Sequence, residues 1–405
     1  MNQDRTHALL LAAALAAGYL VLLAPLAGQP ARWRGDERFY ADAAVQMRQS
    51  GDGFAIRYGD GTLRFRKPVL SYWAVLASYR LFGIGLAATR WPALAAGGLT
   101  VGLIYLVGLR FYGRRGPALA GASLFAMLAL VYKLSLRATP DMLQTLFLTL
   151  SGYGFLGLAL SARQRPLALA LGYGGAALGI ANKGLTGLLP PLCVWIWLRG
   201  ARDRSARPGG LFSWPAFLLS LPVAGGWYLL ASWRYGAATG FEFLGDQVGE
   251  RLNLNPLHAL GFAVRYLAAL PVLLLPGSLA ALICAWARPG SGRAFAAAQP
   301  GVARAAALWP AVWLAVFSCG NIFRPRYFLP VCPWLCVALG GYLAKWGGAA
   351  LAASARLRRW LLGGGVALGL CQLALALAGA AAGVWSAAAY GAAGLAALGA
   401  AGRRW

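Results

Sequence analysis

The chain has 405 residues, of which 60% are hydrophobic and only 12% are charged, and its mean hydropathy is +0.60. Soluble globular domains carry about 25% charged residues, so this composition excludes an ordinary soluble protein. The formal net charge of +26 could indicate nucleic-acid binding. However, the basic residues lie in short loops between apolar stretches and not along one polar domain, which favours a membrane protein.

The apolar stretches are long enough to cross a bilayer, which takes about 20 helical residues. We therefore predict an all-α, polytopic membrane protein, a single domain over residues 1–405 with about 11–13 transmembrane helices and no C-terminal soluble domain. The first stretch is long for a signal peptide and no clear cleavage site follows it, so we expect a retained helix. The predicted spans are 8–27, 88–109, 116–134, 140–161, 166–182, 184–199, 211–234, 262–287, 305–320, 327–346, 360–380 and 383–401.

The loops between these spans differ in charge. With the N-terminus inside, every short inner loop is basic and almost free of acidic residues, as the positive-inside rule predicts. Two outer loops, residues 28–68 and 235–261, are longer. Titratable groups that gather on one face of a membrane protein indicate a binding or reaction site on that face. All but two of the acidic residues fall on the outer side, namely Asp36, Glu37, Asp42, Asp52, Asp60, Asp141, Glu242, Asp246 and Glu250.

The first outer loop opens with an amphipathic segment. Its apolar residues recur at helical spacing and Gly51 ends the run, so we expect a helix that lies on the membrane surface. Asp36 could be the N-cap of this helix and Glu37 an acid that compensates its dipole. A carboxylate at a helix start could equally serve a cavity at the membrane edge. The apolar residues are Phe39, Tyr40, Ala43, Ala44 and Met47.

Two later helices are predicted to begin at proline beside a charged residue. Lys67 precedes Pro68, and a cation at a helix N-terminus opposes the helix dipole unless an anion shares the site. The alternative is a lysine that snorkels beside lipid headgroups. Thr139–Pro140–Asp141 begins a span in the same way, with Asp141 in the first turn, where dipole compensation is the simpler interpretation.

Three further outer segments carry polar groups. Asn182–Lys183–Gly184 separates two helices and could be only a turn. The second outer loop contains Glu250, Arg251 and His258. Arg324–Pro325–Arg326–Tyr327 begins another span, where Arg and Tyr are common interfacial anchors.

Other motifs point away from metal or nucleotide chemistry. The cysteines all lie in apolar spans, where Cys behaves as a small hydrophobic residue, and no zinc-binding spacing occurs. A GxGxxG at Gly152, Gly154 and Gly157 lies within a span and follows no strand, so it predicts close helix packing. We expect no metal and no cofactor.

The outer segments in chain order resemble a known family. They read DE…YA…M…SGD, then KP…YW, PD at a helix start, KG, FL…R and finally PRY..P. This order, over residues 30–335, resembles the lipid-donor GT-C glycosyltransferases, in particular the bacterial aminoarabinose lipid A transferases and the protein mannosyltransferases. Many relatives have Glu where this chain has Arg66, which argues against a metal ligand there.

The resemblance implies a partner, a place and a reaction. The donor would be a polyprenyl-phosphate-linked sugar, and the acceptor a membrane-embedded or periplasmic hydroxyl or phosphate, on lipid A or lipopolysaccharide, another glycan or a protein. The protein would lie among membrane lipids in the bacterial inner (plasma) membrane, with its active site facing the periplasm and no nucleic acid as partner. The acceptor would attack the anomeric carbon while polyprenyl phosphate leaves, which inverts the sugar.

The segments and the resemblance together assign roles to individual residues. A cation that binds the leaving phosphate better after cleavage lowers the barrier, and an acid near the acceptor takes or orients its proton. The rival interpretations are a transporter or flippase of a lipid-linked sugar or other anion and, more weakly, a scaffold protein, although transporters usually show internal repeats. We expect catalytic roles for Asp36, Glu37 and Asp141, donor-phosphate binding by Lys67, Arg251, Tyr327, Arg326 and Lys183, and further cavity contacts by Tyr72, Glu250 and His258.

Overall fold

The computed structural model describes residues 2–30, 35–160, 165–200, 208–236, 245, 253 and 255–353. Arg251, Glu250, most of the predicted second outer loop and the predicted spans 360–380 and 383–401 lie outside the described residues. Within the described part the chain is helical, and its only β-type pairing is an isolated bridge between Arg57 and Leu63.

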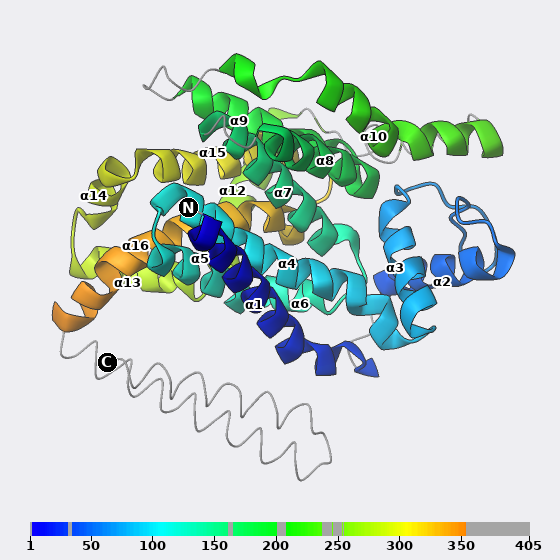
Figure 1. The fold of residues 1–405 in the computed structure, drawn as a ribbon, viewed down its shortest axis with the longest axis horizontal. Helices are drawn as coiled ribbons and strands as arrows, with labels where there is room; N and C mark the ends of the chain where they lie inside the picture. Colours follow the sequence, from blue (N-terminus) through cyan, green and yellow to red (C-terminus); the bar gives the residue numbers. More distant parts are fainter. Residues whose placement is uncertain are drawn as a thin grey trace, which may run out of the picture.

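The helices follow one another closely along the chain and form one bundle (Figure 1). In the drawing, α2 and α3 lie at one end of this bundle and α14 lies at the other. The helices are α1 (Asn2–Ala27), α2 (Gly35–Ser50), α3 (Leu70–Phe82), α4 (Leu86–Tyr112), α5 (Arg115–Met127), α6 (Ala129–Ser135), α7 (Pro140–Leu160), α8 (Arg165–Lys183), η2 (Leu185–Leu188), α9 (Leu189–Arg199), η3 (Pro208–Leu211), α10 (Trp214–Tyr235), α12 (Pro256–Leu273), α13 (Gly277–Ala287), α14 (Ser291–Ala298), α15 (Pro300–Phe317), η5 (Pro325–Val331) and α16 (Cys332–Ala353).

The membrane character of the chain is confirmed, and the described residues contain fewer full-length spans than the sequence predicted for them. In the described part, 7 helices are long and apolar enough to cross a membrane, or up to 8 if the pair α5 and α6, bent by 64°, is one span. The predicted span 184–199 is the shorter helical stretch Leu185–Arg199, and the predicted span 262–287 divides into α12 and α13. The bend between α5 and α6 and the break between α12 and α13 account for part of the difference, whereas α8, over the predicted span 166–182, is one unbroken helix.

Glycine lets the central helices approach closely. A Cβ on Gly102 of α4 would lie 2.5 Å from the carbonyl oxygen of Ala12 in α1, and a Cβ on Gly154 of α7 would collide with the backbone of Gly172 in α8. This close approach leaves no room for a side chain at either position. The prediction that the GxGxxG run serves helix packing is therefore confirmed.

The helix predicted in the first outer loop is present as α2, and its expected position on the membrane surface stays a prediction. Its apolar face is covered by protein, because Tyr40 and Met47 belong to a buried cluster with Tyr72 and Val75 of α3 and Trp227 of α10. The segment after α2 folds back with the Arg57–Leu63 bridge and leads into α3. This small second core fixes the start of α2 against the main bundle.

Candidate active site

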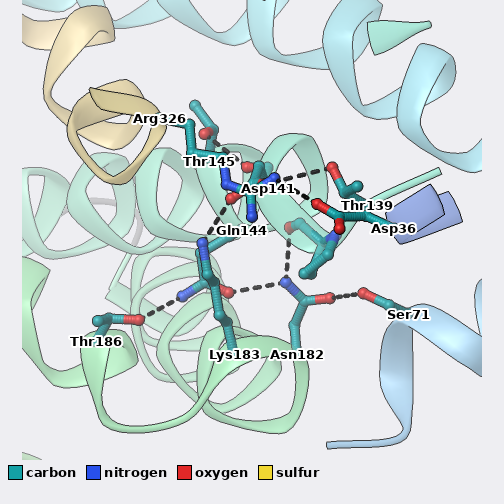
Figure 2. Close-up of polar contacts among 11 residues, drawn as sticks. Asp36, Ser71, Thr139, Asp141, Gln144, Thr145, Asn182, Lys183, Thr186 and Arg326 are labelled. Carbon is teal, nitrogen blue, oxygen red and sulfur yellow. Dashed lines mark hydrogen bonds and ion pairs between the residues drawn. The ribbon is translucent and has the colours of Figure 1, made fainter. Parts of the chain in front are cut away.

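Four segments that are far apart in the sequence meet around one group of charges (Figure 2). They are the start of α2, the α6–α7 connection with the start of α7, the end of α8, and η5. These segments supply Asp36, Arg137 with Asp141, Lys183 and Arg326. We refer to these five residues as the ion cluster.

Asp36 is the accessible carboxylate of the ion cluster. Its Oδ2 lies 3.4 Å from Nη2 of Arg137 and 3.3 Å from Nη1 of Arg326, while 46% of its side chain remains exposed. It lies in the first turn of α2, where an acid also suits the helix dipole. Asp36 therefore faces solvent and two guanidinium groups at once.

Asp141 is the buried carboxylate of the cluster. Its Oδ1 lies 2.5 Å from Nζ of Lys183, and its Oδ2 accepts a hydrogen bond from the Thr139 hydroxyl at 3.0 Å and lies 3.8 Å from Nη1 of Arg326. Its side chain is only 3% exposed. Arg326 thus bridges the two carboxylates. Lys183 also lies 4.7 Å from the ring centre of Tyr327.

The residue before Lys183, Asn182, is buried, and its side-chain amide forms three hydrogen bonds. Asn182 Nδ2 donates to the carbonyl oxygen of Pro140 at 3.0 Å and to Oε1 of Gln144 at 2.8 Å, and its Oδ1 accepts from the Ser71 hydroxyl at 2.5 Å. Gly184 follows with φ of +79°, so the helix ends directly after Lys183. The three hydrogen bonds fix this end of α8 against α7 and α3.

Glu37 is placed differently from its neighbour Asp36. It is fully buried and binds Arg90 of α4 with both carboxylate oxygens, at 2.9 and 3.1 Å. Its Oε1 also accepts the backbone N–H of Ala138 at 2.9 Å. Engagement of both oxygens by the protein favours a structural contact over a contact with substrate.

Tyr72 lies in a neighbouring aromatic group. Its ring stacks on that of Tyr40 at 4.8 Å between centroids, and its hydroxyl accepts a hydrogen bond from Arg64. Burial raises the pKa of Tyr72 to about 12 and raises the pKa of Tyr40 as well. Both phenols therefore stay neutral at physiological pH. Lys67 is half-buried in the segment before α3.

His258 lies in the first turn of α12, which Asn255 caps. The His258 ring nitrogen Nε2 lies 3.1 Å from the carbonyl oxygen of Gly320, and its ring packs on Phe262 at 4.2 Å. The structure thus joins His258 to the backbone after α15. Its predicted cavity contact stays a prediction, as do those of the residues outside the described part.

The sequence interpretation missed Arg137 and Arg90. Arg137 precedes Pro140 by three residues, much as Lys67 precedes Pro68, and that pattern could have pointed to it. Arg90 is an arginine within the first turns of an apolar helix, where an ionised group is costly unless it is paired. Both partners are distant in sequence, so the pairings themselves carry no local signal.

The ion cluster has more positive than negative groups. Three cations, Arg137, Lys183 and Arg326, surround two carboxylates, and the Nε atoms of Arg137 and Arg326 are buried without a hydrogen-bond partner. Such a site can hold a monoanion such as a phosphodiester beside an accessible carboxylate. In the described part no group of three or more His, Cys, Asp or Glu could hold a metal ion.

Solved structures share this fold. The structure of ArnT from Cupriavidus metallidurans bound to undecaprenyl phosphate matches with a TM-score of 0.69 at 21% identity, over 95% of this chain and 74% of that one. The apo structure of the same protein matches with a TM-score of 0.67. The chain is a polytopic helical membrane protein with the GT-C fold.

Sequence comparisons agree with the fold. The family "Dolichyl-phosphate-mannose-protein mannosyltransferase" matches residues 66–231. Relatives named "Undecaprenyl phosphate-alpha-4-amino-4-deoxy-L-arabinose arabinosyl transferase" are 31% identical in Pseudomonas paraeruginosa, over 85% of this chain and 61% of the relative, and 30% identical in Pseudomonas aeruginosa, over 93% and 65%. The chain thus spans less than two thirds of the length of these relatives. This similarity in sequence and in fold confirms the resemblance drawn from the motifs.

Proposed function

We propose that the protein transfers a sugar from a polyprenyl-phosphate donor to an acceptor at the periplasmic face of the bacterial inner membrane. The observation that carries this proposal is the ion cluster, in which a half-exposed carboxylate is held by guanidinium groups beside a partly buried lysine. The names of the relatives, and the undecaprenyl phosphate bound by the ArnT of the same fold, support the class of donor.

The two carboxylates suit different roles. Asp141 is buried and its oxygens contact Lys183, Thr139 and Arg326, so it holds the cations in place. Asp36 is accessible, and it would take or orient the acceptor proton, a contribution of about 10²–10⁴-fold in rate. The base is therefore Asp36.

The cations suit the leaving group. A phosphodiester donor carries one negative charge, and the polyprenyl phosphate that leaves gains about one more. Lys183 and Arg326, together with Lys67 from the neighbouring segment, would bind this charge more strongly as the bond to the sugar breaks. A single displacement with a base and no covalent intermediate gives inversion at the anomeric carbon.

The function is tested by finding the donor that accumulates. Mass spectrometry of a strain that lacks the protein should show one undecaprenyl-phosphate-linked sugar accumulating and one glycan losing that sugar. The purified protein in vesicles should then release undecaprenyl phosphate from this donor when extract containing the acceptor glycan is added. Movement of intact donor across the vesicle membrane without cleavage would instead show a transporter.

The orientation needs its own test. In a chain whose native cysteines are replaced by alanine, Asp60→Cys after α2 should react with an impermeant thiol reagent in intact cells. Arg293→Cys in α14, which is exposed at the other end of the bundle, should react only after the cells are opened. The reverse pattern would place the ion cluster on the cytoplasmic side.

A further inference from the structure

Two adjacent links join α2 to the α6–α7 connection. In the first link, Asp36 Oδ2 lies 3.4 Å from Nη2 of Arg137. In the second link, the backbone N–H of Ala138, the residue after Arg137, donates at 2.9 Å to Oε1 of Glu37, the residue after Asp36. The first link is partly exposed and belongs to the ion cluster. The second is buried beneath it.

The buried link is anchored by Arg90. This guanidinium binds both oxygens of Glu37 and donates through Nη1 to the carbonyl oxygens of Ala27 and Gln29, each at 3.0 Å. Both side chains of the pair are 0% exposed. One ion pair therefore ties together the end of α1, the start of α2, the start of α4 and the connection before α7.

A bidentate pair fixes direction as well as distance, because its two parallel hydrogen bonds allow little rotation. Arg90 holds Glu37 in this way, and Asp36 is the residue directly before Glu37. Arg137 is in turn the residue directly before Ala138, whose N–H binds Glu37. The contacts of the neighbouring residues, Glu37 and Ala138, thus fix the position of Asp36 relative to Arg137. A misplacement of about 1 Å can cost about 10²-fold in rate.

We propose that the Glu37–Arg90 pair is a positioning device for the reaction, which sets Asp36 against Arg137 without touching either substrate. The inference rests on the proposed function, since it assigns the pair a purpose in sugar transfer. It also changes the role expected for Glu37, from a group that reacts to one that aligns its neighbour. The phosphate-binding cations Lys183 and Arg326 contact Asp141 and not this pair, so donor binding depends on the pair little.

The test removes the pair as a unit. Replacing a buried ion pair by apolar residues of similar volume is often neutral for stability, whereas removing one partner leaves a buried charge. The variant Glu37→Met/Arg90→Met should therefore remain folded and bind undecaprenyl phosphate with nearly unchanged Kd. With the donor that accumulates in the deletion strain, its kcat should fall about 10–100-fold with little change in KM.

Hydrogen exchange supplies a readout that does not depend on activity. The peptide containing Ala138 should exchange faster in the double variant, because its N–H loses the Glu37 acceptor. Arg90→Lys, which keeps the charge and loses the fork, should show a smaller change of the same kind and serves if the double variant does not fold.

The outcomes separate the two proposals. Faster exchange at Ala138 together with a lower kcat and an unchanged Kd supports the positioning role. A folded variant with the kcat of the unaltered protein, or with unchanged exchange, overturns it. Absence of transfer by the unaltered protein with every undecaprenyl-phosphate-linked sugar would overturn the proposed function, while exchange at Ala138 would still report whether the pair holds the connection.

Discussion

The two ends of the bundle differ in whether their basic residues form ion pairs with carboxylates. At the α2 end, Arg90, Arg137, Lys183 and Arg326 bind carboxylates. At the other end, Arg110 donates to the carbonyl oxygen of Tyr153 and lies 3.8 Å from its ring, and Arg304 donates to the carbonyl oxygen of Trp197. Backbone carbonyls and aromatic rings suffice to anchor a cation at a membrane surface.

From this difference we infer a separate role for each end. Basic residues that bind carbonyls and rings need no acid, and they orient the chain in the bilayer. Carboxylates beside them add a cost of desolvation that stability alone does not require. At the α2 end, carboxylates are desolvated in the ion cluster, which has an excess of cations and one accessible acid. This arrangement suits the proposed reaction.

The largest expected contrast concerns the buried pair. Arg90→Ala should lower the free energy of unfolding by about 3–5 kcal/mol, because it leaves Glu37 buried and unpaired. Arg110→Ala at the other end should cost about 1.5–3 kcal/mol, since it removes a hydrogen bond from a charged group to a carbonyl. Denaturation in detergent compares the two. Equal losses would show that the ends do not differ in the way described.

A second contrast concerns the amides and hydroxyls beneath each end. Asn182→Leu should cost about 1–3 kcal/mol, because it leaves buried partners on α3 and α7 without hydrogen bonds. At the other end, Tyr173→Phe removes the hydroxyl that joins Leu211 and Ser213, and it should cost about 1 kcal/mol. Thermal unfolding measures both. A larger loss in the Tyr173 variant would contradict the ranking.

Local sequence signals predicted most residues of the ion cluster, but they did not separate Asp36 from Glu37 in α2. Asp141, Lys183 and Arg326 were found because each lies at a helix end beside proline or glycine. Asp36 and Glu37 looked equivalent, but the helical period puts Glu37 on the same face as Tyr40, Ala44 and Met47, and burial follows from that face. This signal was present in the sequence and could have separated the two acids.

The partners of these residues could not be predicted from the sequence. Arg90 and Glu37 are 53 residues apart, and Arg326 and Asp36 are 290 apart. Which helix ends meet depends on the packing of the whole bundle, including the glycine contacts between α1 and α4 and between α7 and α8. Hydropathy gave the helices, but their breaks at α5–α6 and α12–α13 follow from tertiary packing and turns.

A third contrast concerns phosphate binding. Lys183→Met should weaken the binding of undecaprenyl phosphate about tenfold or more, equivalent to about 1.4 kcal/mol. Lys345→Met, which removes a lysine that lies on the Trp346 ring at the other end, should leave Kd unchanged. Binding in nanodiscs measures both. The variant Lys183→Met/Asp141→Leu removes the buried acid as well, and its unchanged Kd would show that Lys183 does not contact the phosphate.

The smallest effect is expected at the other end. Arg304→Gln should change sugar transfer by no more than about twofold, since the residue donates to the carbonyl oxygen of Trp197 and lies far along the bundle from the ion cluster. The rate of transfer by protein in vesicles measures this. A loss comparable to that of an ion-cluster variant would mean that the basic end takes part in the reaction.

In the proposed reaction, the accessible carboxylate at the α2 end, Asp36, takes or orients the acceptor proton. Asp36→Asn keeps its shape and most of its hydrogen bonding, and it removes the charge and the ability to accept a proton. Transfer and the binding of undecaprenyl phosphate should be measured on one preparation of this variant. We expect transfer to fall about 10²-fold or more with binding retained. Near-normal transfer by Asp36→Asn would rule out a catalytic role for this carboxylate.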